Sequence, residues 1–197
     1  MPKADHIITA DDILSLDDYI PVRKEKRSAL VTMKKPRRLH LGPHATAYFE
    51  NWDTMWAQIQ EMLYIEKGGD EQLKDELAAY NPLIPQGRDL VCTFMFEIDE
   101  PARRLNILRQ LGGIENHIFL QVGDDKIYAR PEEDVERTTP DGKTSSVHFF
   151  HFDFTDDQIA TFRDPSTQVM LGADHENYAH LALLSDDGRQ SLAGDFS

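Results

Sequence analysis

The 197-residue sequence has little cysteine and no long apolar run. Its single cysteine, Cys92, excludes an intrachain disulfide and a thiolate metal cluster. Because Cys92 lies in the apolar run 90–96, we expect a small buried side chain rather than a nucleophile. No apolar stretch approaches the roughly 20 residues of a membrane helix. The first six residues also lack the apolar segment of a signal peptide, so we expect a cytoplasmic protein.

Short catalytic and binding signatures are missing as well. The chain contains no P-loop, no glycine fingerprint for dinucleotides, no nucleophile-elbow serine, no zincin helix motif and no paired-cysteine motif. This excludes the enzyme classes that such motifs identify and leaves open whether the protein is an enzyme. Repeats and domain linkers are lacking too, so we expect a single domain over 1–197, with frayed polar ends at about 1–8 and 186–197.

The chain has fewer basic than acidic residues, with 21 Lys and Arg and 35 Asp and Glu, which gives a net charge of −14. Such a field repels phosphate, so we expect neither nucleic acid nor a membrane surface as partner. The segment 23–38 opposes this trend, with eight basic residues and only Glu25 against them. It either pairs with the acidic remainder of the fold or binds a phosphate-bearing ligand or an acidic protein. Arg37 and Arg38 are the candidate anion-binding residues.

Apolar residues make up 40% of the chain, enough for a packed core, and their spacing alternates between helical and strand periods. Helices are expected over 17–35, 51–67, 71–79, 101–111 and 155–162. Strands are expected over 37–41, 45–49, 89–97, 115–122, 126–130, 145–154, 169–171 and 178–184. The pattern predicts an α+β fold, in which N-terminal helices and a helical pair pack on one mostly antiparallel sheet of about six to eight strands.

Eight histidines are many for a chain of this length, and three are candidate ligands. His44 follows a tight Gly-Pro turn that aims its side chain. His148 and His151 stand three apart on a strand, so they point to opposite faces, and His148 shares its face with phenylalanines. His175 is flanked by Asp174 and a glutamate. For each histidine, burial against a backbone carbonyl is the structural alternative.

Two carboxylates complete the candidate site. Glu66 lies within about 20° of Ile59 on a helix, near the middle of the apolar face, where a carboxylate is costly unless paired or bound to metal. It alternatively reaches water past the edge of the core, or pairs with Arg37 or Arg38. Glu50 and Glu97 both lie at strand ends, where converging carboxylates can divide acid and base roles.

Several strings resemble a bacterial family called domain of unknown function 3501. They include Gln58-Ile-Gln-Glu-Met62 and Ala79-Tyr-Asn-Pro-Leu-Ile-Pro85, together with 8–14, 37–38, 41–44, 49–50 and 146–149. The family's Asp-His pair near the C-terminus corresponds to Asp174-His175. Members are often encoded beside rubrerythrin-like and iron–sulfur proteins, which implies an iron, peroxide-stress or electron-transfer setting by association.

Two main hypotheses follow. In the first, the protein is linked to redox chemistry or peroxide stress and binds iron or another divalent metal. Its ligands would be drawn from His44, His148, His175, Glu50 and Glu66. In the second, it is a non-catalytic accessory protein that docks on a rubrerythrin-like or iron–sulfur partner, through the basic segment 23–38 or the helix side formed by Gln58 and Glu61. An enzyme that acts on a small anion held by Arg37 and Arg38 is a third possibility.

Overall fold

The computed structural model describes residues 5–132, 138–139 and 142–197. The helices are α1 (Leu16–Lys34), α2 (Trp52–Glu66), α3 (Gly69–Tyr80), α4 (Pro101–Leu108), α5 (Asp156–Arg163) and α6 (Asp186–Ala193). The strands are β1 (Arg38–Leu41), β2 (Ala45–Glu50), β3 (Asp89–Phe96), β4 (Ile118–Val122), β5 (Asp125–Tyr128), β6 (Arg130–Pro131), β7 (Val147–Asp153), β8 (Val169–His175) and β9 (Tyr178–Leu183). The predicted α+β class is confirmed.

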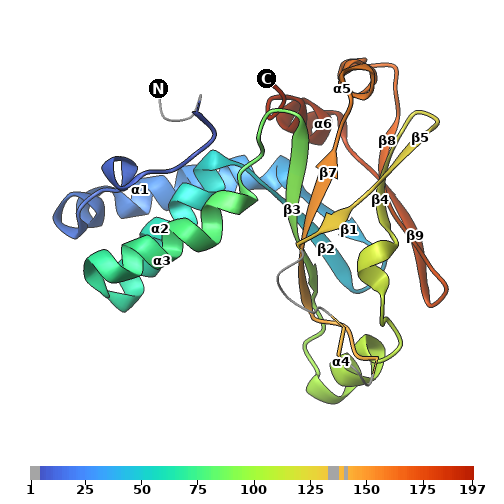
Figure 1. Ribbon diagram of the computed structural model, residues 1–197, viewed down its shortest axis with the longest axis horizontal. Helices are drawn as coiled ribbons and strands as arrows, with labels where there is room; N and C mark the ends of the chain where they lie inside the picture. Colours follow the sequence, from blue (N-terminus) through green and yellow to red (C-terminus); the bar gives the residue numbers. More distant parts are fainter. Residues whose placement is uncertain (1–4, 133–137, 140–141) are drawn as a thin grey trace.

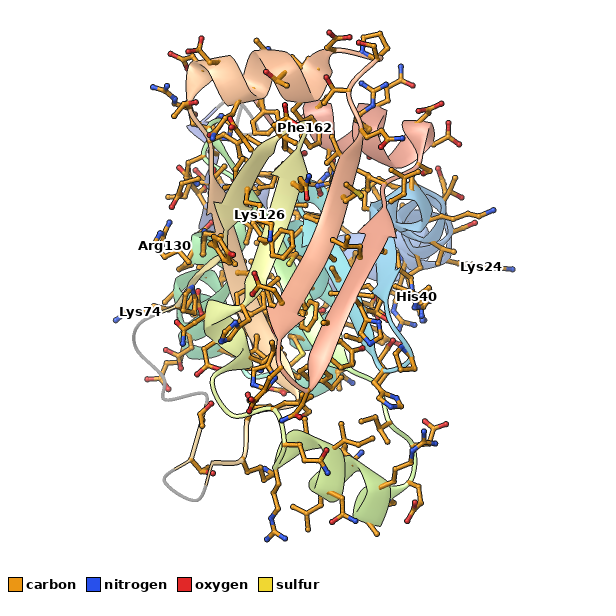
Figure 2. The ribbon with its side chains drawn as sticks, turned by 90° about the vertical axis from the view of Figure 1, so that its right-hand side faces the viewer. Lys24, His40, Lys74, Lys126, Arg130 and Phe162 are labelled. Carbon is orange, nitrogen blue, oxygen red and sulfur yellow. The ribbon has the colours of Figure 1, made fainter. Side chains whose placement is uncertain are left out.

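The molecule has three layers (Figure 1). Sheet A contains strands in the order β1-β2-β3-β7-β6, and sheet B contains them in the order β5-β4-β8-β9. Helices α1, α2 and α3 lie on one face of sheet A, and sheet B lies on the other (Figure 1). Figure 2 views sheet B from its outer side, with α5 above the sheets, α4 below them and Lys24 of α1 projecting at one edge.

The expectation of a single sheet was wrong, because the strands divide between two sheets. One segment takes part in both: β5 pairs with β4 in sheet B, and β6 pairs with β7 in sheet A, with Ala129 between them. All the pairings are antiparallel. Strand periodicity shows which face of each strand is apolar, but two packed sheets and one larger sheet require the same local pattern.

Sheet A separates two apolar clusters. The larger lies between the sheets and contains Phe94, Phe96, Phe150 and Phe152 among other buried residues. The smaller lies between sheet A and the helices; its fully buried members are Ile8, Met55, Ile59, Leu83, Ile84 and Val91. Side chains alternate across a strand, so the residues of sheet A that face the helices form a separate set from the interior phenylalanines. Several of them are polar, and this face of the sheet carries the candidate site.

Two side-chain amides hold the N-terminal segment against the helices. Gln60 accepts a hydrogen bond of 3.0 Å from the backbone N–H of Leu14 and donates one of 3.0 Å to its carbonyl. Asn81 binds the backbone of Ile8 in the same two-sided way, at 2.7 and 2.9 Å. Such paired bonds satisfy the backbone of an otherwise irregular segment. Gln86 also donates a hydrogen bond to the carbonyl of His6, so the N-terminal end is anchored as far back as His6, whereas residues 1–4 lie outside the described part.

The C-terminal end differs from the expected frayed tail. Residues 186–193 form α6, and Leu192 and Phe196 are buried in the main core. The Phe196 ring lies 4.9 Å from that of Phe154 and 5.4 Å from that of Phe162. The segment is polar in composition, but Leu192 and Phe196 pack in the core and Asp195 forms an ion pair with Arg37. No helix in the described ranges combines the length and apolar character needed to cross a membrane.

Candidate functional site

Two of the candidate histidines are held by the fold itself. His148 is fully buried, and its Nε2 lies 3.0 Å from the carbonyl oxygen of Ser145 and 3.2 Å from the hydroxyl of Thr144. His175 is buried at the end of β8, with Nε2 3.2 Å from the Gly112 carbonyl and Nδ1 accepting a bond from the Asn177 N–H. Both rings therefore have the structural role that was the alternative to metal binding.

The remaining candidate ligands do not join them. His44 is half-buried at the start of β2, and its backbone carbonyl accepts a bond of 2.7 Å from the Glu97 N–H. Glu66 is exposed at the end of α2 and accepts a bond of 3.0 Å from Gln72. Among the residues that the structure describes, no group of three or more His, Cys, Asp or Glu side chains has a geometry that could hold a metal ion.

Arg37 is a fold-stabilising residue, and only 3% of it is exposed. Its guanidinium forms a bidentate ion pair with Asp195, at 2.5 and 3.2 Å. The remaining donors bond the carbonyl oxygens of Phe49, Glu50 and Ser191. All five guanidinium donors are thus used within the chain, and the geometry offers none to the anionic ligand expected from the sequence.

Arg38 and Glu61 also have partners in the fold. Arg38 is half-exposed, lies 3.8 Å from Glu97 and stacks over the Tyr48 ring. Glu61 accepts hydrogen bonds from Tyr19 and, at two points, from Arg23, both on α1. The helix side that contains Glu61 is therefore covered by α1. Docking on a rubrerythrin-like or iron–sulfur partner remains a prediction, and the exposed lysines of α1 are the surface available for it.

Glu50 differs from these residues. It ends β2, and only 5% of it is exposed. Its Oε1 accepts a hydrogen bond of 2.8 Å from the Thr93 hydroxyl on the neighbouring strand β3. Its Oε2 is buried and has no hydrogen-bond partner in the structure. Buried carboxylate oxygens are costly to leave unsatisfied, so an open acceptor of this kind needs an explanation.

Glu50 forms part of the wall of a cavity of about 280 Å³. We call it the Glu50 cavity. It lies between sheet A and the helices, slightly below the ~300–1,000 Å³ usual for ligand pockets. Its polar lining consists of Lys34, Tyr48, Glu50, Gln58, Tyr80 and Thr93. Its apolar lining consists of Met55, Leu83, Met95, Val147 and Phe149. An apolar pocket with a few convergent polar groups is the usual form of a small-molecule site.

Tyr48 connects the cavity to a second carboxylate. Its hydroxyl donates a hydrogen bond of 2.6 Å to Glu97 Oε1, while Glu97 Oε2 accepts one from the Thr46 hydroxyl. Burial raises the pKa of Tyr48, and the bond to Glu97 raises it further. Burial acts to raise the pKa of Glu97, but the bonds from Thr46 and Tyr48 outweigh it and leave that pKa lowered. Glu50 and Glu97 do not converge as the acid–base hypothesis expected, because Glu50 pairs with Val91 at one end of the β2–β3 pair and Glu97 follows Phe96 at the other end.

A larger groove of about 530 Å³ lies between α1 and α2, lined in part by Leu30, Met33, Trp52 and Trp56. Within the described residues, none of its lining side chains carries a buried polar atom without a hydrogen-bond partner. By volume this groove is the better candidate for a ligand site, whereas by the chemistry of its polar groups the Glu50 cavity is the better candidate. We give more weight to the chemistry, because a buried acceptor without a protein partner is a polar feature that needs an explanation, and apolar volume is not.

Sequence reasoning identified Glu50 but missed the residues around it. Tyr48, Tyr80 and Thr93 were not candidates; Lys34 was considered only as part of the basic segment 23–38, and Gln58 only as part of a docking surface. Two signals were present. Positions 46, 48 and 50 alternate as polar residues on a strand otherwise made of Ala and Phe, and Gln58 and Tyr80 fall within the two most distinctive family strings.

Comparison with known proteins agrees with that resemblance. A crystal structure of a "novel protein of unknown function" from Burkholderia pseudomallei is 37% identical, with a TM-score of 0.88; the match covers 96% of this chain and 99% of that one. No curated protein sequence matches the chain. The family model described as "Protein of unknown function (DUF3501)" matches residues 7–196, and the chain therefore belongs to that family.

Proposed function

We propose that the protein binds a small molecule in the Glu50 cavity, and that a cationic or hydrogen-bond-donating group of this ligand contacts Glu50. The observation that carries the proposal is the buried Oε2 of Glu50, which has no partner in the structure although Glu50 is one of the residues that line the cavity. A ligand ammonium group would form a charge-assisted hydrogen bond with this oxygen, one of the stronger types of polar contact.

The cost of an unpartnered buried oxygen supports a functional role for Glu50. Leaving one buried polar atom unsatisfied costs about 1–3 kcal/mol, and more when the atom is charged. A leucine or methionine at this position, with a valine in place of Thr93, would avoid that cost. Natural proteins accept such local conflicts mainly at functional sites, where the missing interaction comes from the ligand.

The lining of the cavity favours an organic cation over iron. No histidine or cysteine is found among its described lining residues, and Glu50 is the one carboxylate there. Its other oxygen and nitrogen groups are phenols, a hydroxyl, an amide and an ammonium group. A non-haem iron site usually combines imidazoles with carboxylates, so the iron and redox hypothesis has little support from this donor set. Binding of a divalent metal is therefore an outcome to be tested against binding of an organic cation.

The proposal is tested with ethylamine as a probe, by isothermal titration calorimetry and thermal unfolding. Wild-type protein is expected to bind ethylamine and to unfold at a higher temperature in its presence, because a ligand of the native state stabilises that state. Glu50→Gln removes the anionic acceptor and should abolish both effects. Glu66→Gln is the matched control, since it makes the same change at an exposed position outside the cavity.

Equal ethylamine binding by wild type and Glu50→Gln would contradict the proposal. Titration with Mn²⁺ alone, in a separate series, distinguishes a metal from an organic cation. Binding of Mn²⁺ that is lost in Glu50→Gln, with no binding of ethylamine, would replace the proposal by a metal site at Glu50.

A further inference from the structure

We propose that the ligand of the Glu50 cavity is a small zwitterion, a short-chain amino carboxylate, whose ammonium group contacts Glu50 and whose carboxylate contacts Lys34. This inference rests on the proposed function and adds the chemical class of the ligand. It requires the cavity to present one group of each charge, positioned so that a single small molecule reaches both.

The two charged groups come from different elements. Glu50 is the last residue of β2, and Lys34 is the last residue of α1; both line the cavity. Glu50 is almost completely buried, whereas Lys34 is partly exposed, so the anionic group lies deeper than the cationic group. A ligand would therefore enter with its ammonium group first and leave its carboxylate toward the opening.

Lys34 and Glu50 do not neutralise one another. In the described part of the chain, no ion pair within 4.0 Å joins them, and the Lys34 side chain has neither a hydrogen bond nor another ion-pair partner. Arg23 and Arg27, on the same helix, show the contrast, because both reach Glu61. The cavity is therefore lined by two opposite charges that do not pair with each other. A ligand with one positive and one negative group would pair with both of them.

The rest of the lining suits the carbon chain between the two ends of such a ligand. Met55, Met95 and Phe149 provide apolar contacts, while the hydroxyls of Tyr48 and Tyr80 provide hydrogen-bonding groups. The volume of about 280 Å³ has room for a few carbon atoms between an ammonium group and a carboxylate. A nucleotide or a folded peptide segment is too large for it.

The test compares amino carboxylates with amines of similar size. Glycine, β-alanine and γ-aminobutyrate provide a series of increasing length, and ethylamine and propylamine are the amines without a carboxylate. We expect wild-type protein to bind at least one member of the series about tenfold or more tightly than the amines, as measured by calorimetry. One length should bind best, because the distance between Lys34 and Glu50 is set by the fold.

Lys34→Gln separates the two kinds of ligand. It removes the contact to the carboxylate and should weaken binding of the amino carboxylate about tenfold. The same change removes a positive charge that repels amines, so ethylamine should bind slightly more tightly. Opposite effects on two ligands cannot come from a general loss of folding, and the thermal unfolding midpoint checks folding directly. Lys35→Gln is the matched control, because Lys35 is the exposed neighbour and lies outside the cavity lining.

Failure of this inference is distinguishable from failure of the proposed function. If amines bind through Glu50 but amino carboxylates bind no better, or if Lys34→Gln changes neither affinity, the zwitterion is excluded and the cation site stands. If neither amines nor amino carboxylates bind to folded wild-type protein, both the proposed function and this inference are overturned.

Discussion

The side-chain amide of Gln58 on α2 donates a hydrogen bond of 3.3 Å to the hydroxyl of Tyr80 at the end of α3, and both residues line the Glu50 cavity. They belong to the two strings that most clearly indicate the family, QIQEM and AYNPLIP. Other residues of these strings serve the fold, because Gln60 and Asn81 anchor the N-terminal segment. Gln58 and Tyr80 are therefore the polar residues of these strings that line the cavity, where Leu83 of the second string adds an apolar contact.

Tyr80→Phe is expected to weaken binding in the cavity more than it weakens the fold. The change removes one hydroxyl and keeps the ring, so ligand affinity should fall about fivefold, equivalent to a hydrogen bond of ~1 kcal/mol. Calorimetry with the tightest-binding amino carboxylate measures this. Tyr64→Phe is the control, because Tyr64 lies against Arg23 and outside the cavity lining. The same loss of affinity in both variants would argue against a role for Tyr80.

Glu50→Gln is expected to stabilise the ligand-free protein. The amide is neutral, so burying it costs less than burying a carboxylate with one unsatisfied oxygen, and the free energy of unfolding should rise by about 1 kcal/mol. Urea unfolding of wild type and variant without ligand measures the difference. A clear loss of stability would instead show that Glu50 contributes to the fold, and would weaken the argument from its open oxygen.

Arg37→Gln is expected to destabilise the protein strongly. It breaks the buried ion pair with Asp195 and leaves carbonyl oxygens on β2 and α6 without donors, so the free energy of unfolding should fall by about 3–5 kcal/mol. Arg38→Gln, next in sequence but half-exposed, should cost less than about 1 kcal/mol. Similar urea midpoints for the two variants would contradict the fold-stabilising role of Arg37.

Glu61 gives the fold a dependence on pH. Hydrogen bonds from Arg23 hold the pKa of Glu61 below its ordinary 4.5, burial opposes this shift, and Tyr19 adds to it. Because the pKa is lowered by folding, Glu61 contributes stability above about pH 4.5 that is lost as the pH falls through the lowered pKa. Glu61→Gln should therefore cost about 1–2 kcal/mol at pH 7 and show a weaker loss of stability in acid. Urea unfolding between neutral and acidic pH measures both; parallel curves for wild type and variant would contradict this.

His175→Ala tests the metal hypothesis against the role seen in the fold. Loss of the bonds to Gly112 and Asn177 should lower the free energy of unfolding by about 1–3 kcal/mol, while the metal content of purified protein stays unchanged. Elemental analysis of protein prepared without chelator or affinity tag measures the metal. A drop from stoichiometric iron to none in the variant would restore His175 as a ligand.

The sequence by itself determined the local elements. The helix predicted over 51–67 is α2, at Trp52–Glu66, and the hairpin predicted around the Gly-Pro turn is formed by β1 and β2. The sequence placed His148 on the same strand face as the phenylalanines, and His148, Phe150 and Phe152 are all buried in the structure. Periodicity is enough for these features because each depends on residues a few positions apart.

The tertiary structure alone decided how the elements meet. The partition into two sheets, the Arg37–Asp195 ion pair across 158 positions and the order of the C-terminal tail depend on contacts between segments far apart in the chain. The Glu50 cavity is of the same kind, because its polar lining comes from α1, β2, α2, α3 and β3. A single sequence contains the apolar pattern of each segment but not the distances between them, so it shows that Glu50 lies at a strand end and not that a cavity lies beside it.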